Sequence, residues 1–156
     1  MSRKIIYMAA PVRPSQQDIN GISVSNDKLA IATATSRNIH RGCRWLRWLC
    51  QSFPEATFIA PWLASILSGE DDADPAQREA GLIDACAVIE RCDGIALVGG
   101  RMSDGMRREL GHLIPSGTIY DFLRFGIVDP PEPRHFTQLA KWALESWAVK
   151  QPGWRV

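Results

Sequence analysis

The sequence of 156 residues lacks the features that mark several large classes of protein. No run approaches the roughly twenty apolar residues of a membrane-spanning helix, so we expect no membrane partner. The segment Met1 to Lys4 leads into an apolar run and not into a leader with a cleavage site, which predicts a cytoplasmic protein. The formal net charge is only +1, so charge gives no reason to expect a nucleic acid polymer as partner.

The sequence also lacks the usual spacings of metal ligands. Its four cysteines form no CxxC pair, and its three histidines form no HExxH motif. These spacings are typical of zinc sites, so their absence predicts that the protein binds no metal. In a cytoplasmic protein we expect the cysteines to be reduced thiols.

Short apolar runs alternate with segments of helical character. We predict strands at residues 5–10, 57–60, 95–98 and 118–123, and helices at residues 38–53, 75–92, 103–114 and 135–150. Such alternation favours an α/β protein with one domain over residues 1–156, a three-layer Rossmann or flavodoxin-like parallel sheet with helices on both faces. Ligands of such sheets bind at the carboxyl ends of the strands.

Two segments between these elements have possible roles in binding. Residues 13–37 are polar and without a sustained period, which predicts a long active-site loop, of which only residues 28–35 have some helical character. Trp62 follows the second strand after Pro61, in a predicted turn. That position suits a ligand-facing side chain, but packing in the core or at an interface fits equally well.

The predicted helix at residues 38–53 has two distinct faces. Trp45, Trp48, Leu49 and Phe53 form an apolar stripe, and four arginines at spacings of three and four form another: Arg37, Arg41, Arg44 and Arg47. We interpret the arginines as a solvent-exposed face of the helix and prefer this to a role in binding phosphate.

The most informative stretch is Gly99 to Glu109. After a buried strand come two glycines, a short turn and a helix that Ser103 or Asp104 can cap. The free N–H groups of its first turn, among them those of Gly105 and Met106, form a seat for an anion. Glu109 lies about one and a half turns further on, within reach of a ligand seated there. A capped surface helix is the alternative interpretation.

Three segments, in this order, resemble the nucleoside 2-deoxyribosyltransferase-like superfamily. They are the strand at residues 5–11, the helix and strand at residues 84–95, and the loop and helix that end at Glu109. The resemblance implies that Glu109 is a nucleophile that forms a glycosyl ester. It also implies that Asp84 is a partly buried acid that handles the nucleobase, and that Tyr7 orients the nucleophile.

Two positions distinguish the branches of that superfamily. Transferases of free nucleosides usually have an aspartate six residues before the glutamate, where this chain has Ser103. A serine there, together with an arginine six residues after the tyrosine, here Arg13, resembles the 2′-deoxynucleoside 5′-phosphate N-hydrolases. A serine, an arginine and a helix N-terminus attract a phosphate, whereas an aspartate repels it. Asp104 could instead bind the sugar if the loop is shifted by one residue.

The resemblance therefore implies an N-glycosidase that hydrolyses a (deoxy)nucleoside 5′-monophosphate to free base and sugar 5-phosphate, with no cofactor, and a homodimer or larger homo-oligomer. Two alternatives stay open. One is a nucleoside 2-deoxyribosyltransferase that exchanges bases, and the other is a module that binds a nucleotide or an ADP-ribose-type signal without turnover.

Overall fold

The computed structural model describes residues 2–15, 28–69, 74–131 and 149–150. Its sheet has the strand order β2-β1-β3-β4-β5. The strands are β1 (Lys4–Ala9), β2 (Ala56–Ile59), β3 (Gly94–Leu97), β4 (Thr118–Asp121) and β5 (Val149–Lys150). The first four are parallel, and β5 pairs antiparallel with β4. The predicted α/β class is confirmed, and the order is that of flavodoxin-like folds apart from the direction of β5.

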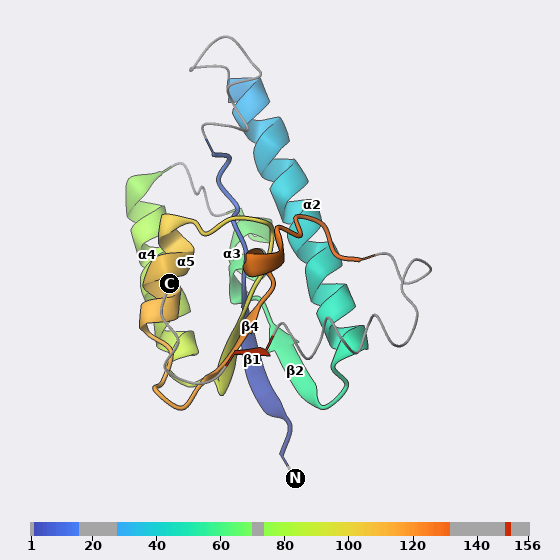
Figure 1. Cartoon of the computed structure of the whole chain (residues 1–156). Coiled ribbons are helices and arrows are strands. Elements are labelled where there is room, and N and C mark those ends of the chain that lie inside the picture. Colours follow the sequence, from blue (N-terminus) through green and yellow to red (C-terminus); the bar gives the residue numbers. More distant parts are fainter. Residues whose placement is uncertain (1, 16–27, 70–73, 132–148, 151–156) are drawn as a thin grey trace.

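Helices cover both faces of this sheet (Figure 1). Helix α2 (Lys28–Ser52) packs on one face, and helices α4 (Pro75–Ile89) and α5 (Asp104–Gly111) pack on the other. Alternate side chains of β1 separate into the two layers, because successive residues of a strand point to opposite faces. Ile6 and Met8 join the core under α2, while Tyr7 and Ala9 join the core under α4 and α5.

The apolar stripe predicted on α2 is confirmed. Trp45, Trp48, Leu49 and the following Phe53 are all buried in one core cluster with Phe122. The indole Nε1 of Trp45 also donates a hydrogen bond of 2.9 Å to the carbonyl oxygen of Val128. This helix is therefore fixed to the sheet over its carboxyl-terminal half.

Helix α2 begins at Lys28 and not at Asn38, so the prediction of a loop through residue 37 is wrong for its second half. Residues 16–27 of that predicted loop lie outside the described residues. The helical character predicted for residues 28–35 is confirmed, although this part of the helix contains two β-branched residues, Thr33 and Thr35. In the helix, their hydroxyls donate to the carbonyls of Leu29 and Ile31, four residues earlier, so the polar groups are accommodated.

Two other helical predictions need correction. Residues 61–63 are not a turn but the start of α3 (Pro61–Leu67), because proline at the first helical position is compatible with a helix. The spacing of Ile83, Cys86, Ala87 and Ile89 in the sequence predicts an apolar face for α4. This prediction is wrong at Ile83, which is 54% exposed, and at Ala87, which is also exposed. Ala85, Cys86 and Ile89 are the buried residues of that helix.

The carboxyl-terminal part differs from the prediction as well. Strand β4 ends at Asp121, whose carboxylate accepts a hydrogen bond from the backbone N–H of Leu123 and starts the short 3-10 helix η1 (Leu123–Phe125). The predicted helix at residues 135–150 falls mostly outside the described residues. Its last two residues form β5 instead, because they pair with the edge of β4. No helix in the described ranges is long and apolar enough to span a membrane.

Candidate functional site

A cavity of about 660 Å³ opens at the carboxyl ends of β1 and β3. The chain leaves β1 toward β2 on one side and leaves β3 toward β4 on the other, so the cavity lies where the strand order reverses. This is the usual ligand position in open parallel sheets. The cavity brings together eight of the residues predicted for the site: Arg13, Trp62, Asp84, Ser103, Asp104, Gly105, Met106 and Glu109.

The turn after β3 depends on two glycines. Gly99 and Gly100 have positive φ angles of 94° and 85°, a conformation that other residues rarely adopt. A Cβ atom on Gly99 would lie 2.6 Å from Cδ of Pro11, so this turn also packs tightly against the segment after β1. The two loops that line the cavity therefore hold each other in place.

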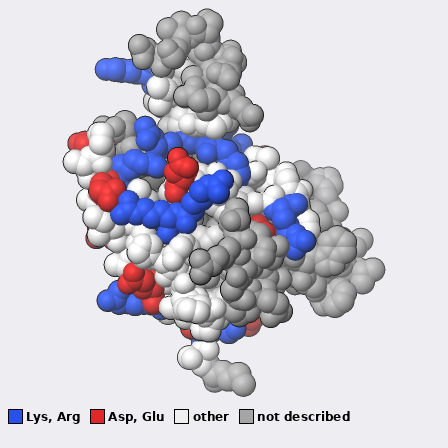
Figure 2. All heavy atoms as spheres, turned by 60° about the vertical axis from the view of Figure 1, so that its left-hand side comes forward, with Lys and Arg blue, Asp and Glu red and all other residues white. Residues whose placement is uncertain are grey.

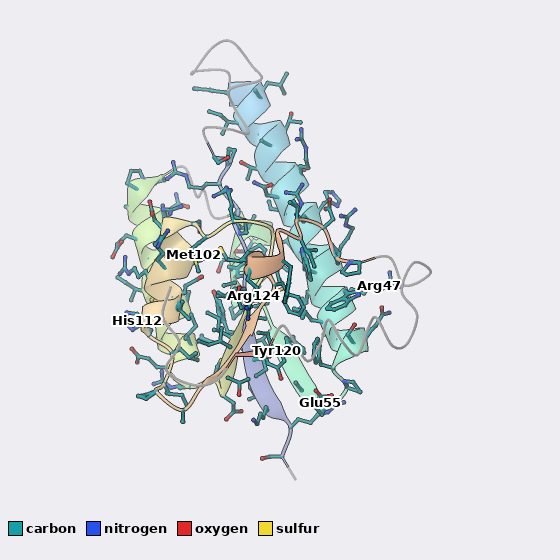
Figure 3. The ribbon with its side chains drawn as sticks, viewed as in Figure 1. Arg47, Glu55, Met102, His112, Tyr120 and Arg124 are labelled. Carbon is teal, nitrogen blue, oxygen red and sulfur yellow. The ribbon has the colours of Figure 1, made fainter. Side chains whose placement is uncertain are left out.

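Helix α5 begins at the cavity with a clear N-cap. Ser103 has extended backbone angles, and its Oγ accepts a hydrogen bond of 3.2 Å from the N–H of Met106. Of the two candidates for the cap, Ser103 is the one observed, and Asp104 is exposed in the first turn. In Figure 3, Met102 marks this end of α5 and His112 marks the opposite end. The positive end of the helix dipole thus faces the cavity.

Tyr7 and Glu109 form a buried pair at the cavity. The hydroxyl of Tyr7 donates a hydrogen bond of 2.8 Å to Oε1 of Glu109. Tyr7 is fully buried, and Glu109 is 7% exposed while still lining the cavity. The hydrogen bond fixes one carboxylate oxygen and leaves Oε2 as the atom that can act on a ligand. This contact joins β1 to α5 across 102 positions of sequence.

Burial raises the pKa of Glu109 from 4.5 to about 7. The hydrogen bond from Tyr7 and the positive charge of Arg78 oppose this rise. The pKa of Tyr7 is raised above its ordinary value, first by burial and then by the neighbouring carboxylate. Tyr7 therefore stays a neutral donor, and Glu109 changes its charge near neutral pH.

Sequence reasoning missed two arginines of the cavity, Arg78 and Arg101. Arg78 lies in the first turns of α4, and Arg101 precedes α5 and donates a hydrogen bond to the carbonyl oxygen of Arg13. Arg78 lies one helical turn before Leu82, which also lines the cavity, but this spacing is informative only once the packing of α4 is known. On the face that α4 and α5 present in Figure 2, basic side chains run around acidic ones.

Asp84 lines the cavity but is exposed, so the expectation of a partly buried acid is wrong. It lies on α4 one turn after Gly81 and one turn before Val88, at the open side of the cavity.

Trp62 has both of the roles that the sequence left open. Its side chain lines the cavity and also packs against the core. The indole Nε1 donates a hydrogen bond of 2.8 Å to the carbonyl oxygen of Met8, and the ring lies against Gly42.

The arginine row of α2 does not belong to this site. Arg41 and Arg44 form ion pairs with Asp129. Arg47 projects from α2 on the side away from α4 and α5 in Figure 3. Within the described residues, no cluster of three or more histidine, cysteine or acidic side chains could hold a metal ion.

Comparisons with known proteins place the site within a family of unknown function. A family model described as a domain of unknown function (DUF7768) matches residues 29–118. The matched segment contains Asp84, Glu109 and the N-terminus of α5, while Tyr7 and Arg13 lie before it. Neither a curated protein nor a solved structure matches the chain.

Proposed function

We infer that the activity of this chain, which belongs to the DUF7768 family of unknown function, resides in the cavity at the carboxyl ends of β1 and β3. We propose that the protein is an N-glycosidase that hydrolyses a (deoxy)nucleoside 5′-monophosphate to free base and sugar 5-phosphate. The observation that carries the proposal is the carboxylate of Glu109, buried at a cavity and held through Oε1 by the hydroxyl of Tyr7.

The position of this carboxylate suits nucleophilic catalysis. A buried carboxylate has lost part of its hydration, and the raised pKa makes it a stronger base than an exposed glutamate. The hydrogen bond from Tyr7 orients the group, so that Oε2 is presented to the ligand in one geometry. Both properties are those expected of an activated nucleophile.

The reaction proceeds in two steps. Oε2 of ionised Glu109 forms a bond to the anomeric carbon as the bond from that carbon to the base nitrogen breaks. The base leaves with the electron pair and takes up a proton from water at the exposed side of the cavity, where Asp84 is its hydrogen-bond partner, and the second step returns a proton to the solvent. Water then hydrolyses the glycosyl ester, which releases the sugar 5-phosphate and regenerates the carboxylate.

A positive environment nearby supports a phosphorylated substrate. The first turn of α5 lies at the cavity, and Ser103, Arg13 and Arg101 line the same space. The N–H of Gly105 has no acceptor within the helix, whereas the predicted contribution of the Met106 N–H is wrong, because that group is bonded to Oγ of Ser103. Helix N-termini and guanidinium groups are preferred binding partners of phosphate oxygens. A free nucleoside would leave this part of the cavity without a partner of opposite charge.

The test is chromatography of ribo- and deoxyribonucleoside monophosphates, and of the matching nucleosides, after incubation with the protein. We expect free base from a monophosphate and none from its nucleoside. A new nucleoside formed only in the presence of a second base would identify a transferase instead. Binding of an intact nucleotide without turnover, unchanged in Glu109→Ala, would identify a binding module and overturn the proposal.

A further inference from the structure

Arg78 is a half-buried arginine of the cavity to which the mechanism above gives no role. We propose that Arg78 is a substrate-binding residue whose guanidinium holds the anionic group of the ligand at the first turn of α5. The identity of that group as a phosphate monoester rests on the proposed function, whereas the binding of an anion does not.

Arg78 and Ser103 both lie close to Gly105 at the start of α5. A Cβ atom on Gly105 would lie 3.8 Å from Nη2 of Arg78 and also 3.8 Å from Oγ of Ser103. Gly105 is the second residue of α5, so its backbone N–H has no acceptor within the helix. A guanidinium, a hydroxyl and a helix N-terminus therefore converge at the cavity wall.

The backbone of Arg78 is fixed by the start of α4. Its N–H donates a hydrogen bond of 2.9 Å to the carbonyl oxygen of Asp74, and the side chain of Asp74 caps the helix through Ala76. An arginine on a fixed helical turn presents several donors in a plane, a geometry that matches the oxygens of a phosphate or sulfate.

Arg78 also acts on the charge of the nucleophile. Tyr7 from β1 and Arg78 and Cys86 from α4 interact with Glu109. The other charged groups that line the same cavity are Asp84 from α4, Asp104 from α5, and Arg13 and Arg101 from the loops, while Arg108 contacts Cys86. Among them, the positive charge of Arg78 lowers the pKa of Glu109. A bound anion opposes that effect, so anion binding and ionisation of Glu109 disfavour each other.

This coupling suits the order of the proposed steps. While the sugar is bound to Glu109 as an ester, the carboxylate has no charge and the phosphate is held tightly. Hydrolysis restores the negative charge of Glu109 beside the phosphate, which favours release of the sugar 5-phosphate. Arg78 thereby links the state of the nucleophile to the affinity for the product.

The test measures the binding of sulfate to the full chain by calorimetric titration. Sulfate is a suitable probe because it stays a dianion between pH 6 and pH 8. We expect sulfate to bind about tenfold more tightly near pH 6 than near pH 8, because the charge of Glu109 opposes it at the higher pH. In Glu109→Gln this dependence on pH should disappear. Arg78→Gln should bind sulfate about tenfold more weakly.

Arg107→Gln is the matched control, because it removes one positive charge from an exposed position of α5 outside the cavity. Its sulfate affinity should equal that of the wild type. Equal affinities of Arg78→Gln and Arg107→Gln, or no sulfate binding by the wild type, would overturn the inference. Sulfate binding that depends on Arg78, in a protein that releases base from no nucleotide, would retain the anion site and reject the proposed hydrolase.

Discussion

The face of the sheet under α2 and the face under α4 and α5 are built from different side chains. Under α2, aromatic rings pack with centroids 5.1 to 6.4 Å apart: Trp45, Trp48, Phe53, Phe58, Tyr120 and Phe122. Charged groups such as Arg44 and Asp129 pair at its exposed edge. Under α4 and α5 the core consists mostly of aliphatic and small residues, with Tyr7 and Glu109 buried among them.

The difference separates stability from reactivity. An aromatic cluster removes a large apolar area from water and stabilises the fold. A buried carboxylate does the opposite when it ionises, because it loses hydration that one hydrogen bond does not replace. The α2 face is therefore the stabilising face, and the α4 and α5 face carries the group that has the clearest chemical use.

The largest effect is expected from removing the nucleophile. Glu109→Ala should lower kcat for base release on the order of 10⁴-fold, because the reacting oxygen is gone while the cavity remains. Nucleotide binding, measured by calorimetry, should persist. Arg107→Gln is the control and should retain the wild-type rate. Full activity of the alanine variant would contradict the assignment of the chemistry to Glu109 and to the face under α4 and α5.

The next largest effect is expected from removing an aromatic ring from the core under α2. Phe122→Ala should reduce the free energy of unfolding by about 3 to 5 kcal/mol, since it leaves a cavity among Trp45, Trp48 and Phe53. Urea unfolding measures this loss, and kcat of the protein that remains folded should stay unchanged. A comparable loss of stability in Glu109→Gln would contradict the comparison.

A third effect concerns the cost of burying Glu109. Its pKa of about 7 in the folded protein exceeds the ordinary value of 4.5, so the folded state binds this proton more tightly than the unfolded state. The resulting stability is complete below pH 4.5 and is lost as pH rises through 7. Relative to Glu109→Gln, the wild type should lose about 3 kcal/mol of unfolding free energy over that window. A difference that does not vary with pH would show that folding does not raise the pKa of Glu109.

The smallest effect is expected from the orienting group. Tyr7→Phe removes the hydrogen bond to Oε1, so the pKa of Glu109 should rise further and kcat/KM should fall about tenfold. Titration of the glutamate carboxyl carbons by NMR measures the pKa, with Glu109→Gln identifying the signal. An unchanged titration midpoint would mean that Tyr7 only fills space.

Much of this arrangement could be predicted from local patterns. The apolar runs located the four parallel strands, and the alternation with helices predicted which ends of the strands meet. The spacing from Gly99 to Glu109 predicted the capped helix. Resemblance supplied the partnership of Tyr7 and Glu109, which no local pattern contains, because the two residues lie in different elements and meet only through the sheet.

Other features depend on the tertiary fold. The first turns of α2 have no apolar stripe, so residues 28–35 showed only some helical character, and a continuous helix from Lys28 to Ser52 could not be predicted. Arg78 follows Asp74 and Pro75 in a segment that reads as a solvated helix start, and its place at the cavity depends on how α4 packs beside α5. The exposure of Asp84 likewise follows from the open side of the cavity and not from its apolar neighbours in sequence.

The central claim is that the buried carboxylate of Glu109 is the nucleophile, and the pH dependence of kcat/KM for base release tests it most directly. Measured from about pH 5 to 9 with the responsive monophosphate, kcat/KM should rise as Glu109 ionises, with a midpoint near the pKa of about 7. A kcat/KM that falls over this range would make Glu109 a proton donor and would contradict the account.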